Sequence, residues 1–254
     1  MATFQEHKAW ARRFLWLCGL AVAGLAAIPA VAERMVPGVG AGDRRGPVDI
    51  LAAPWNSLVK VQSELGIRCT GALVGPGRVL TAAHCLTAPR TGKPVQPSSL
   101  HVLFGYDRGQ YRGHARVRAV ISGPSYDPVH PLEGLAVDWA VLLLDSTAPA
   151  GVPVLPLNHQ VVRGQGMALG GYSQDRAQIL MADTACSLLG RTETPRGWLL
   201  VHDCDGTRGT SGGPLLVRQG DGWAVAGVNV AVVTGDGKRH NLAVPVERFA
   251  FAVR

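Results

Sequence analysis

Short hydrophobic runs, separated by glycine, proline and other turn residues, recur along the chain from residue 55 onward. Ser57 to Gln62 alternates apolar and polar positions, and this two-residue period is typical of a strand with one buried face. The 32 glycines and 17 prolines favour turns over long helices. The pattern therefore predicts an all-β fold of many short strands. Strands are expected over residues 57–62, 69–74, 78–81, 100–105, 114–120, 139–144, 166–172, 198–202, 223–230 and 241–246.

The first 32 residues have the layout of a secretory signal peptide. A start with several basic residues precedes an apolar stretch from 14 to 28, Pro29 ends that stretch, and Ala30-Val31-Ala32 offers a small-residue cleavage site. The alternative, an uncleaved membrane anchor, is disfavoured by the proline and the cleavage site. We therefore expect export to the periplasm or out of the cell, with no stable membrane association after signal removal.

Residues 33–54 are rich in glycine, proline and charge, and indicate an extended leader in front of the main domain, residues 55–254. Arg44-Arg45 is a possible processing site, which would make the leader a short propeptide. The alternative is a surface arm that stays attached and wraps on the domain. The sequence leaves both open.

Composition and charge exclude several classes of function. With 254 residues, 47% of them hydrophobic, the chain can bury a sizeable core. Its net charge of +7 is scattered and is not interleaved with aromatic residues, so no nucleic-acid partner is expected. No glycine cluster has the Lys-Ser/Thr ending of a phosphate loop, and no histidine pair has a metal-binding spacing, so we expect no cofactor and no metal.

Cysteine usage supports export. Of the five cysteines, Cys18 would leave with the signal peptide, and an even number remain: Cys69, Cys85, Cys186 and Cys204. An even cysteine count in an exported chain favours disulfides. A four-cysteine metal site is the alternative, but no Cys-x-x-Cys spacing supports it.

Three segments carry side chains that suit nucleophilic catalysis. Gly209-Thr210-Ser211-Gly212-Gly213-Pro214 places one hydroxyl in a glycine-rich turn, where backbone N–H groups can gather beside it. Thr81-Ala82-Ala83-His84-Cys85 places His84 at the end of an apolar run. Asp138 heads the buried run 139–144, which distinguishes it from the competing Asp127 and Asp145. A serine hydroxyl needs a base, and an imidazole oriented by a carboxylate supplies one.

These three motifs, in the order His84, Asp138, Ser211, resemble those of the trypsin/chymotrypsin family of serine proteases. The similarity extends from about Trp55 to about Phe249 and is closest to the bacterial secreted trypsin-like and glutamyl-endopeptidase-like branch. The resemblance implies two six-stranded antiparallel β-barrels, about 55–150 and about 151–254, with the active site in the cleft between them. It also implies a short helix over 246–253.

The resemblance further implies a secreted serine endopeptidase that acts on protein or peptide substrates, as a monomer, through an acyl-enzyme. His84 would take the proton of Ser211, Asp138 would orient the imidazole, and the backbone N–H groups of Gly209 and Ser211 would form the oxyanion hole. The family bridges the loop beside its histidine, which implies the disulfide Cys69–Cys85 and leaves Cys186 to pair with Cys204.

Two departures from the family concern activation and specificity. Thr210 stands where trypsin-type members carry an aspartate that pairs with a new N-terminal amine, so activation by such an amine is not expected. Asp205 lies where those members place the acid of the S1 pocket, which would select Arg or Lys at P1; the alternative is a turn aspartate that bonds its own loop. Asn229 stands where glutamyl endopeptidases carry a histidine, which disfavours a glutamate preference.

The hypothesis from another class is a catalytically silent binding protein on the same fold. The intact residues His84, Asp138, Ser211 and Gly209 argue against it, because a silent relative would be expected to have lost at least one of them.

Overall fold

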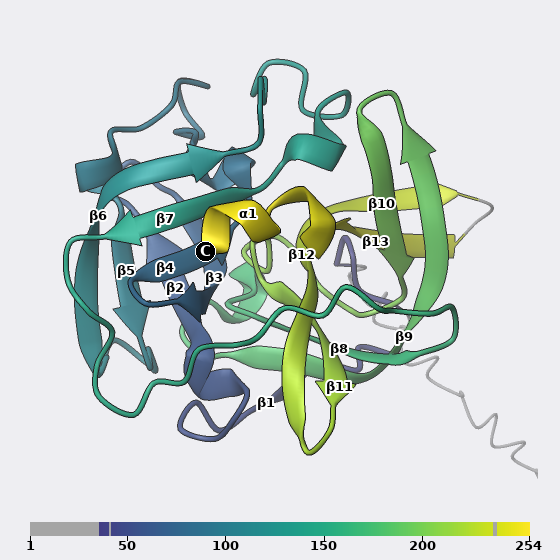
Figure 1. The fold of residues 1–254 in the computed structure, drawn as a ribbon, viewed down its shortest axis with the longest axis horizontal. Helices are drawn as coiled ribbons and strands as arrows, with labels where there is room; N and C mark the ends of the chain where they lie inside the picture. The colour runs from purple at the N-terminus through teal and green to yellow at the C-terminus, as the bar shows by residue number, and fades with distance from the viewer. Residues whose placement is uncertain (1–35, 41, 236–237) are drawn as a thin grey trace, which may run out of the picture. The chain divides into compact units, whose positions relative to one another are not determined.

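The computed structural model describes residues 36–40, 42–235 and 238–254 (Figure 1). The predicted signal peptide lies outside the described residues. The first six-stranded unit is a closed antiparallel barrel with the strand order β2-β3-β4-β7-β6-β5. Its strands are β2 (Leu58–Gln62), β3 (Arg68–Gly75), β4 (Arg78–Thr81), β5 (His101–Phe104), β6 (Gly113–Ser122) and β7 (Ala140–Leu144).

The second unit is a ring of six antiparallel strands with one short strand added outside it. The order is β9-β10-β13-β12-β11-β8, and β8 pairs back onto β9 to close the ring. β1 pairs with β9, with Gly46 opposite Ala182. The strands are β1 (Gly46–Pro47), β8 (Gly166–Gly171), β9 (Met181–Thr194), β10 (Gly197–His202), β11 (Pro214–Gln219), β12 (Gly222–Gly235) and β13 (Lys238–Pro245). The predicted all-β, two-barrel fold is confirmed.

Helices are few and short in the described part of the chain, as the turn-rich sequence predicts. The predicted helix over 246–253 is divided into a 3₁₀ turn and one α-helical turn at the C-terminal end (yellow in Figure 1). The helical elements are η1 (Trp55–Ser57), η2 (Ala83–Leu86), η3 (Pro97–Ser99), η4 (Leu135–Val137), η5 (Gln174–Arg176), η6 (Val246–Arg248) and α1 (Ala250–Val253).

The strand β9 was not predicted from the sequence. Its 14 residues do not alternate regularly between buried and exposed, and its last four residues, which pair with β10, are polar. β9 changes partners along its length: residues up to Ser187 pair with β8, and residues from Leu188 pair with β10. Because β9 pairs with one strand along its first half and with another along its second half, no single face of it is buried throughout. Its hydrophobic residues therefore do not recur at every second position.

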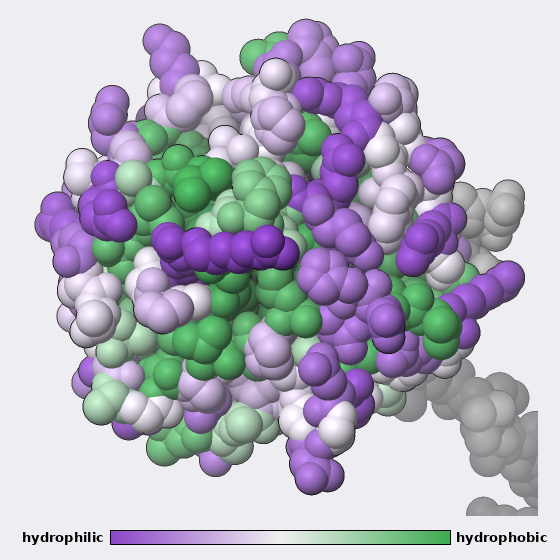
Figure 2. Space-filling view, in the orientation of Figure 1, coloured by the Kyte–Doolittle hydropathy of each residue, from purple (hydrophilic) through white to green (hydrophobic). Residues whose placement is uncertain are grey.

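The core extends through both barrels. One apolar cluster contains residues of both, including Leu58, Leu142 and Leu216, and a second fills the interior of the second barrel around Leu169 and Leu215. On the face that carries α1, hydrophobic residues gather around that helix (Figure 2). In the ranges listed above, no helix has the length and apolar character needed to cross a membrane.

Candidate active site

The strand pairing of the first barrel brings His84 and Asp138 together. Thr81, at the end of β4, lies opposite Ala140, at the start of β7. His84 follows β4 in η2, and Asp138 precedes β7, so the two side chains meet just beyond the paired strand ends. His84 Nδ1 lies 2.7 Å from Asp138 Oδ2, and the His84 backbone N–H donates to Asp138 Oδ1 at 2.8 Å. Asp138 is 1% exposed and the His84 side chain is 32% exposed, so the carboxylate is the shielded partner of the pair.

This geometry stabilises the protonated imidazole. Burial alone would lower the pKa of His84, but the Asp138 carboxylate outweighs it, and the pKa lies above its ordinary value. Tyr126, in the loop that leads to Asp138, was missed by sequence reasoning, since one aromatic residue in a long loop carries no distinct signal. Burial first, and then the nearby Asp138 and Asp127 carboxylates, raise the pKa of Tyr126.

The turn that carries Ser211 belongs to the second barrel and contacts strand β3 of the first barrel. The Ser211 carbonyl accepts a hydrogen bond of 2.9 Å from the Thr70 N–H on β3 and lies 3.9 Å from Cys85 Sγ. Cys85 neighbours His84 and is joined to Cys69 in a disulfide. The Ser211 backbone therefore lies close to the disulfide that follows His84. Among the described residues no hydrogen bond joins the Ser211 hydroxyl to His84; in enzymes without substrate this bond is often long and tightens in the complex.

The glycines of the turn are required by close backbone contacts. Gly212 has φ of +79°, and a Cβ there would collide with Thr81 Oγ1 and the Thr70 carbonyl. Gly209 has φ of +91°, and a Cβ there would collide with the Tyr172 carbonyl. Only glycine fits such positions without strain. Within the ranges that the structure describes, neither the Gly209 nor the Ser211 N–H donates to an acceptor, so both can serve an oxyanion.

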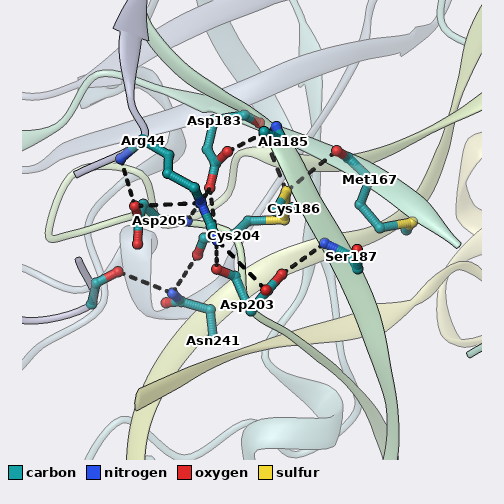
Figure 3. Close-up of a disulfide and its surroundings, with 11 residues drawn as sticks. Arg44, Met167, Asp183, Ala185, Cys186, Ser187, Asp203, Cys204, Asp205 and Asn241 are labelled. Carbon is teal, nitrogen blue, oxygen red and sulfur yellow. Dashed lines mark hydrogen bonds and ion pairs between the residues drawn. A yellow bond between two sulfur atoms is a disulfide. The ribbon is translucent and has the colours of Figure 1, made fainter. Parts of the chain in front are cut away.

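Asp205, the candidate S1 acid, binds the leader (Figure 3). Its Oδ1 accepts a hydrogen bond from the Gly40 N–H at 2.7 Å, and its Oδ2 accepts one from the Arg44 N–H at 2.8 Å. The Asp205 N–H donates to Asp183 Oδ2 at 2.8 Å, and Arg44 Nη2 lies 3.0 Å from the same oxygen. The Cys186–Cys204 disulfide lies within this cluster. Asp205 is 5% exposed, and its carboxylate is in contact with Gly40 and Arg44.

The leader is thus a docked arm where the structure describes it. The Gly38 carbonyl accepts hydrogen bonds from the Gly206 N–H at 2.9 Å and from Asn241 Nδ2 at 3.2 Å. Arg239 Nη1 donates to the carbonyls of Val36 and Val39 at 3.1 and 2.9 Å. Every one of these contacts is long-range in sequence, so the sequence alone could not predict where the leader docks.

Two buried polar side chains, Asn229 and His202, lie on strands of the second barrel. Asn229 on β12 exchanges backbone hydrogen bonds with Gly212 and Gly213, at 2.8 and 2.9 Å. His202 on β10 is fully buried, and burial lowers its pKa to about 4, against weaker opposing effects of Asn229 and Asp203. The sequence indicated that His202 is a surface residue or a satisfied strand residue. The surface alternative is wrong, because the ring is buried on β10, where the Asn229 side chain is the first polar group that acts on it.

Thr210, beside the serine, carries no charge and is held by a neutral contact. Its Oγ1 lies 3.0 Å from Ser173 Oγ, and both side chains are buried. Among described residues, the single group of three metal-type ligand atoms is Cys69, His84 and Cys85. Two of these atoms are the joined sulfurs of a disulfide, so they are not thiolate ligands.

The chain is similar to known proteins of one family. The trypsin family model matches residues 46–253. Human granzyme M is 35% identical over 134 residues, which cover 53% of this chain and 40% of granzyme M. Human transmembrane protease serine 5 is 28% identical over 201 residues, 69% of this chain and 42% of that protein. The chain therefore spans less than half the length of these curated relatives.

Two solved structures share the fold. A Glu endopeptidase, solved in complex with MPD, superposes with a TM-score of 0.67 at 21% identity, covering 82% of this chain and 95% of the endopeptidase. The thermostable serine protease AL20, from an extremophilic microorganism, superposes with a TM-score of 0.58 at 21% identity, covering 78% of this chain and 97% of AL20. The match to the family model begins at Gly46, inside the segment that the sequence indicated as a leader.

Proposed function

We propose that this chain, which belongs to the trypsin family, is an exported serine endopeptidase that uses His84, Asp138 and Ser211. The observation that carries the proposal is the short contact between His84 Nδ1 and Asp138 Oδ2, 2.7 Å long, in which the carboxylate is buried and the imidazole is partly exposed. Asp138 fixes the imidazole so that Nε2 is free to accept the hydroxyl proton.

The reaction follows from these positions. His84 takes the proton as Ser211 Oγ attacks a peptide carbonyl, and the imidazolium is stabilised by Asp138. The N–H groups of Gly209 and Ser211 bind the oxyanion of the tetrahedral intermediate. His84 then returns the proton to the leaving amine, and water hydrolyses the acyl-enzyme by the same route.

For substrate specificity, we propose a preference for Arg or Lys at P1. This preference requires that the Asp205 carboxylate be accessible to the P1 side chain. Asp205 already accepts hydrogen bonds from Gly40 and Arg44 at both carboxylate oxygens. A basic P1 side chain would have to share or displace these contacts. Comparing P1 profiles of the wild type and Asp205→Asn tests the role of Asp205: loss of a basic preference supports it, and identical profiles contradict it.

Export is proposed on the predicted signal peptide and on two disulfides, which persist in oxidising compartments. N-terminal sequencing of the protein secreted by its host would locate the signal cleavage. A start after Ala32 supports the proposal, and a start at Gly46 would instead make residues 33–45 a propeptide.

The decisive experiment is hydrolysis of an unbiased peptide library by the purified wild type and by Ser211→Ala. Cleavage that is lost in the variant supports a serine endopeptidase and gives the P1 profile. Labelling by a fluorophosphonate, which needs an activated serine, distinguishes this from a silent binding protein. No cleavage and no labelling of the folded wild type would refute the proposal.

A further inference from the structure

Arg45 is held between two carboxylates. Its Nε and Nη2 donate to Asp43 at 2.8 and 3.0 Å, and its Nη1 and Nη2 donate to Asp175 at 3.0 and 2.8 Å. The Arg45 side chain is 2% exposed. Two such pairs on one group require the planar fork of a guanidinium, which lysine lacks. From the sequence, Arg45 was identified only as the second residue of the possible processing site Arg44-Arg45.

Asp175 belongs to the turn that supports the serine loop. It lies in η5, directly after Gln174, whose backbone N–H donates to the Arg208 carbonyl at 2.6 Å. The residue before this turn, Ser173, contacts the hydroxyl of Thr210. The turn therefore meets the serine loop on both sides of Gly209.

The contact at Arg208 determines where the Gly209 N–H points. In a trans peptide the carbonyl and the following N–H point in opposite directions. Holding the Arg208 carbonyl against Gln174 thus directs the Gly209 N–H away from that turn. The Gly209 carbonyl is held as well, by a hydrogen bond of 2.8 Å from Thr70 Oγ1. A glycine at φ of +91° has other accessible conformations, so these contacts select one of them.

We propose that Arg45 is a positioning residue for the oxyanion hole. By binding Asp175, it fixes the turn whose Gln174 N–H holds the Arg208–Gly209 peptide in the orientation that presents the Gly209 N–H to the oxyanion. The inference rests on the proposed protease function. It makes residues 43–45 a working part of the catalytic domain, in place of an inhibitory or removable propeptide.

The first test is the variant Gln174→Pro, which removes the backbone N–H that donates to the Arg208 carbonyl. Ser173 has φ of −56° and ψ of 137°, a conformation that a residue before proline adopts readily, and Gln174 opens a helical turn, where proline is tolerated. The proline ring removes the N–H and displaces the Arg208 carbonyl. Since one oxyanion donor contributes about 10²–10³ in kcat, we expect kcat to fall about 100-fold with KM changed less than about twofold. Gln174→Ala, which removes an exposed side chain and keeps the N–H, is the matched control.

The second test removes the guanidinium, in Arg45→Gln. We expect kcat to fall at least about 10-fold, because only part of the molecules would keep the peptide oriented. Arg239→Gln, which releases the carbonyls of Val36 and Val39 without touching Asp175, controls for loosening of the leader. The double variant Arg45→Gln/Asp175→Asn should lose no more than Arg45→Gln alone, because both changes break one contact.

A transition-state readout separates positioning from a general loss of structure. A peptide aldehyde with the preferred P1 residue forms a tetrahedral adduct with an oxyanion, whereas the matching peptide alcohol binds without one. We expect Arg45→Gln and Gln174→Pro to weaken aldehyde binding about as much as kcat and to leave alcohol binding unchanged. Equal weakening of both ligands, or wild-type kcat in both variants, would overturn the inference while the wild type remained a protease. Loss of wild-type cleavage concerns the proposed function instead.

Discussion

Lys60 on β2 gives a quantitative test of the packing between the barrels. It is 4% exposed, its ammonium donates to the Ala177 carbonyl at 2.8 Å, and it lies 3.8 Å from the centre of the Tyr106 ring. These contacts do not offset the loss of water, because burial first, and then the charge of Arg68, lower the pKa of Lys60 from 10.5 to about 8. Replacing Lys60 by methionine keeps the length of the side chain and removes the charge.

The direction in which the free energy of unfolding changes with pH follows from the number of protons that the folded and unfolded chains bind. Below pH 8 both the folded and the unfolded chain hold the Lys60 proton, so the cost of the buried charge is fully present. Between pH 8 and 10.5 the unfolded chain binds more protons than the folded chain, so wild-type stability rises with pH. With these two pKa values, the wild type should gain about 2.5 kcal/mol relative to Lys60→Met between pH 7 and pH 10.

The assay is urea unfolding at pH 7 and pH 10 in a Ser211→Ala background, which prevents self-digestion. Lys93→Met, at an exposed position, is the matched control, and its difference from the parent should stay constant between the two pH values. A stability difference between Lys60→Met and the parent that is equal at both pH values would refute the reasoning.

Three further predictions concern the candidate site and its support. The acid limb of kcat/KM should titrate above 6.5, because the neutral imidazole is the base and Asp138 raises the pKa of His84; a limb centred at or below 6.5 would contradict this assignment. Asp138→Asn should lower kcat about 10⁴-fold with an unchanged unfolding midpoint, and a loss below tenfold would reject Asp138 as the orienting group. Replacing both Cys186 and Cys204 by alanine opens a loop of 18 residues and should lower the free energy of unfolding by about 3 kcal/mol in urea titrations, and an unchanged value would contradict that estimate.

The candidate site could be predicted largely from local sequence. Ser211 is set among glycines that its turn requires, His84 follows the strand over 78–81, and Asp138 heads a buried strand. Each signal needs only the residue and its near neighbours, because turn conformation and strand burial depend on short-range geometry. The order of the three residues then indicated the family, which the family model confirms.

The roles of the charged residues around the site depended on the tertiary structure. Arg44 and Arg45 suggested a processing site in the sequence, but their partners include Asp183 and Asp175, which lie 139 and 130 residues away along the chain. Asp205 fitted a specificity pocket by position, yet its carboxylate accepts backbone N–H groups of the leader.

By itself, then, the sequence determined the strands with a single buried face, the glycine-rich turn and the three residues proposed for catalysis. The tertiary structure decided the path of β9, the burial of His202 and the docking of the leader on the second barrel. The physical reason is that strand periodicity and turn geometry are short-range properties of the backbone. The environment of a charge, by contrast, is set by whichever distant residues the fold brings within a few ångströms of it.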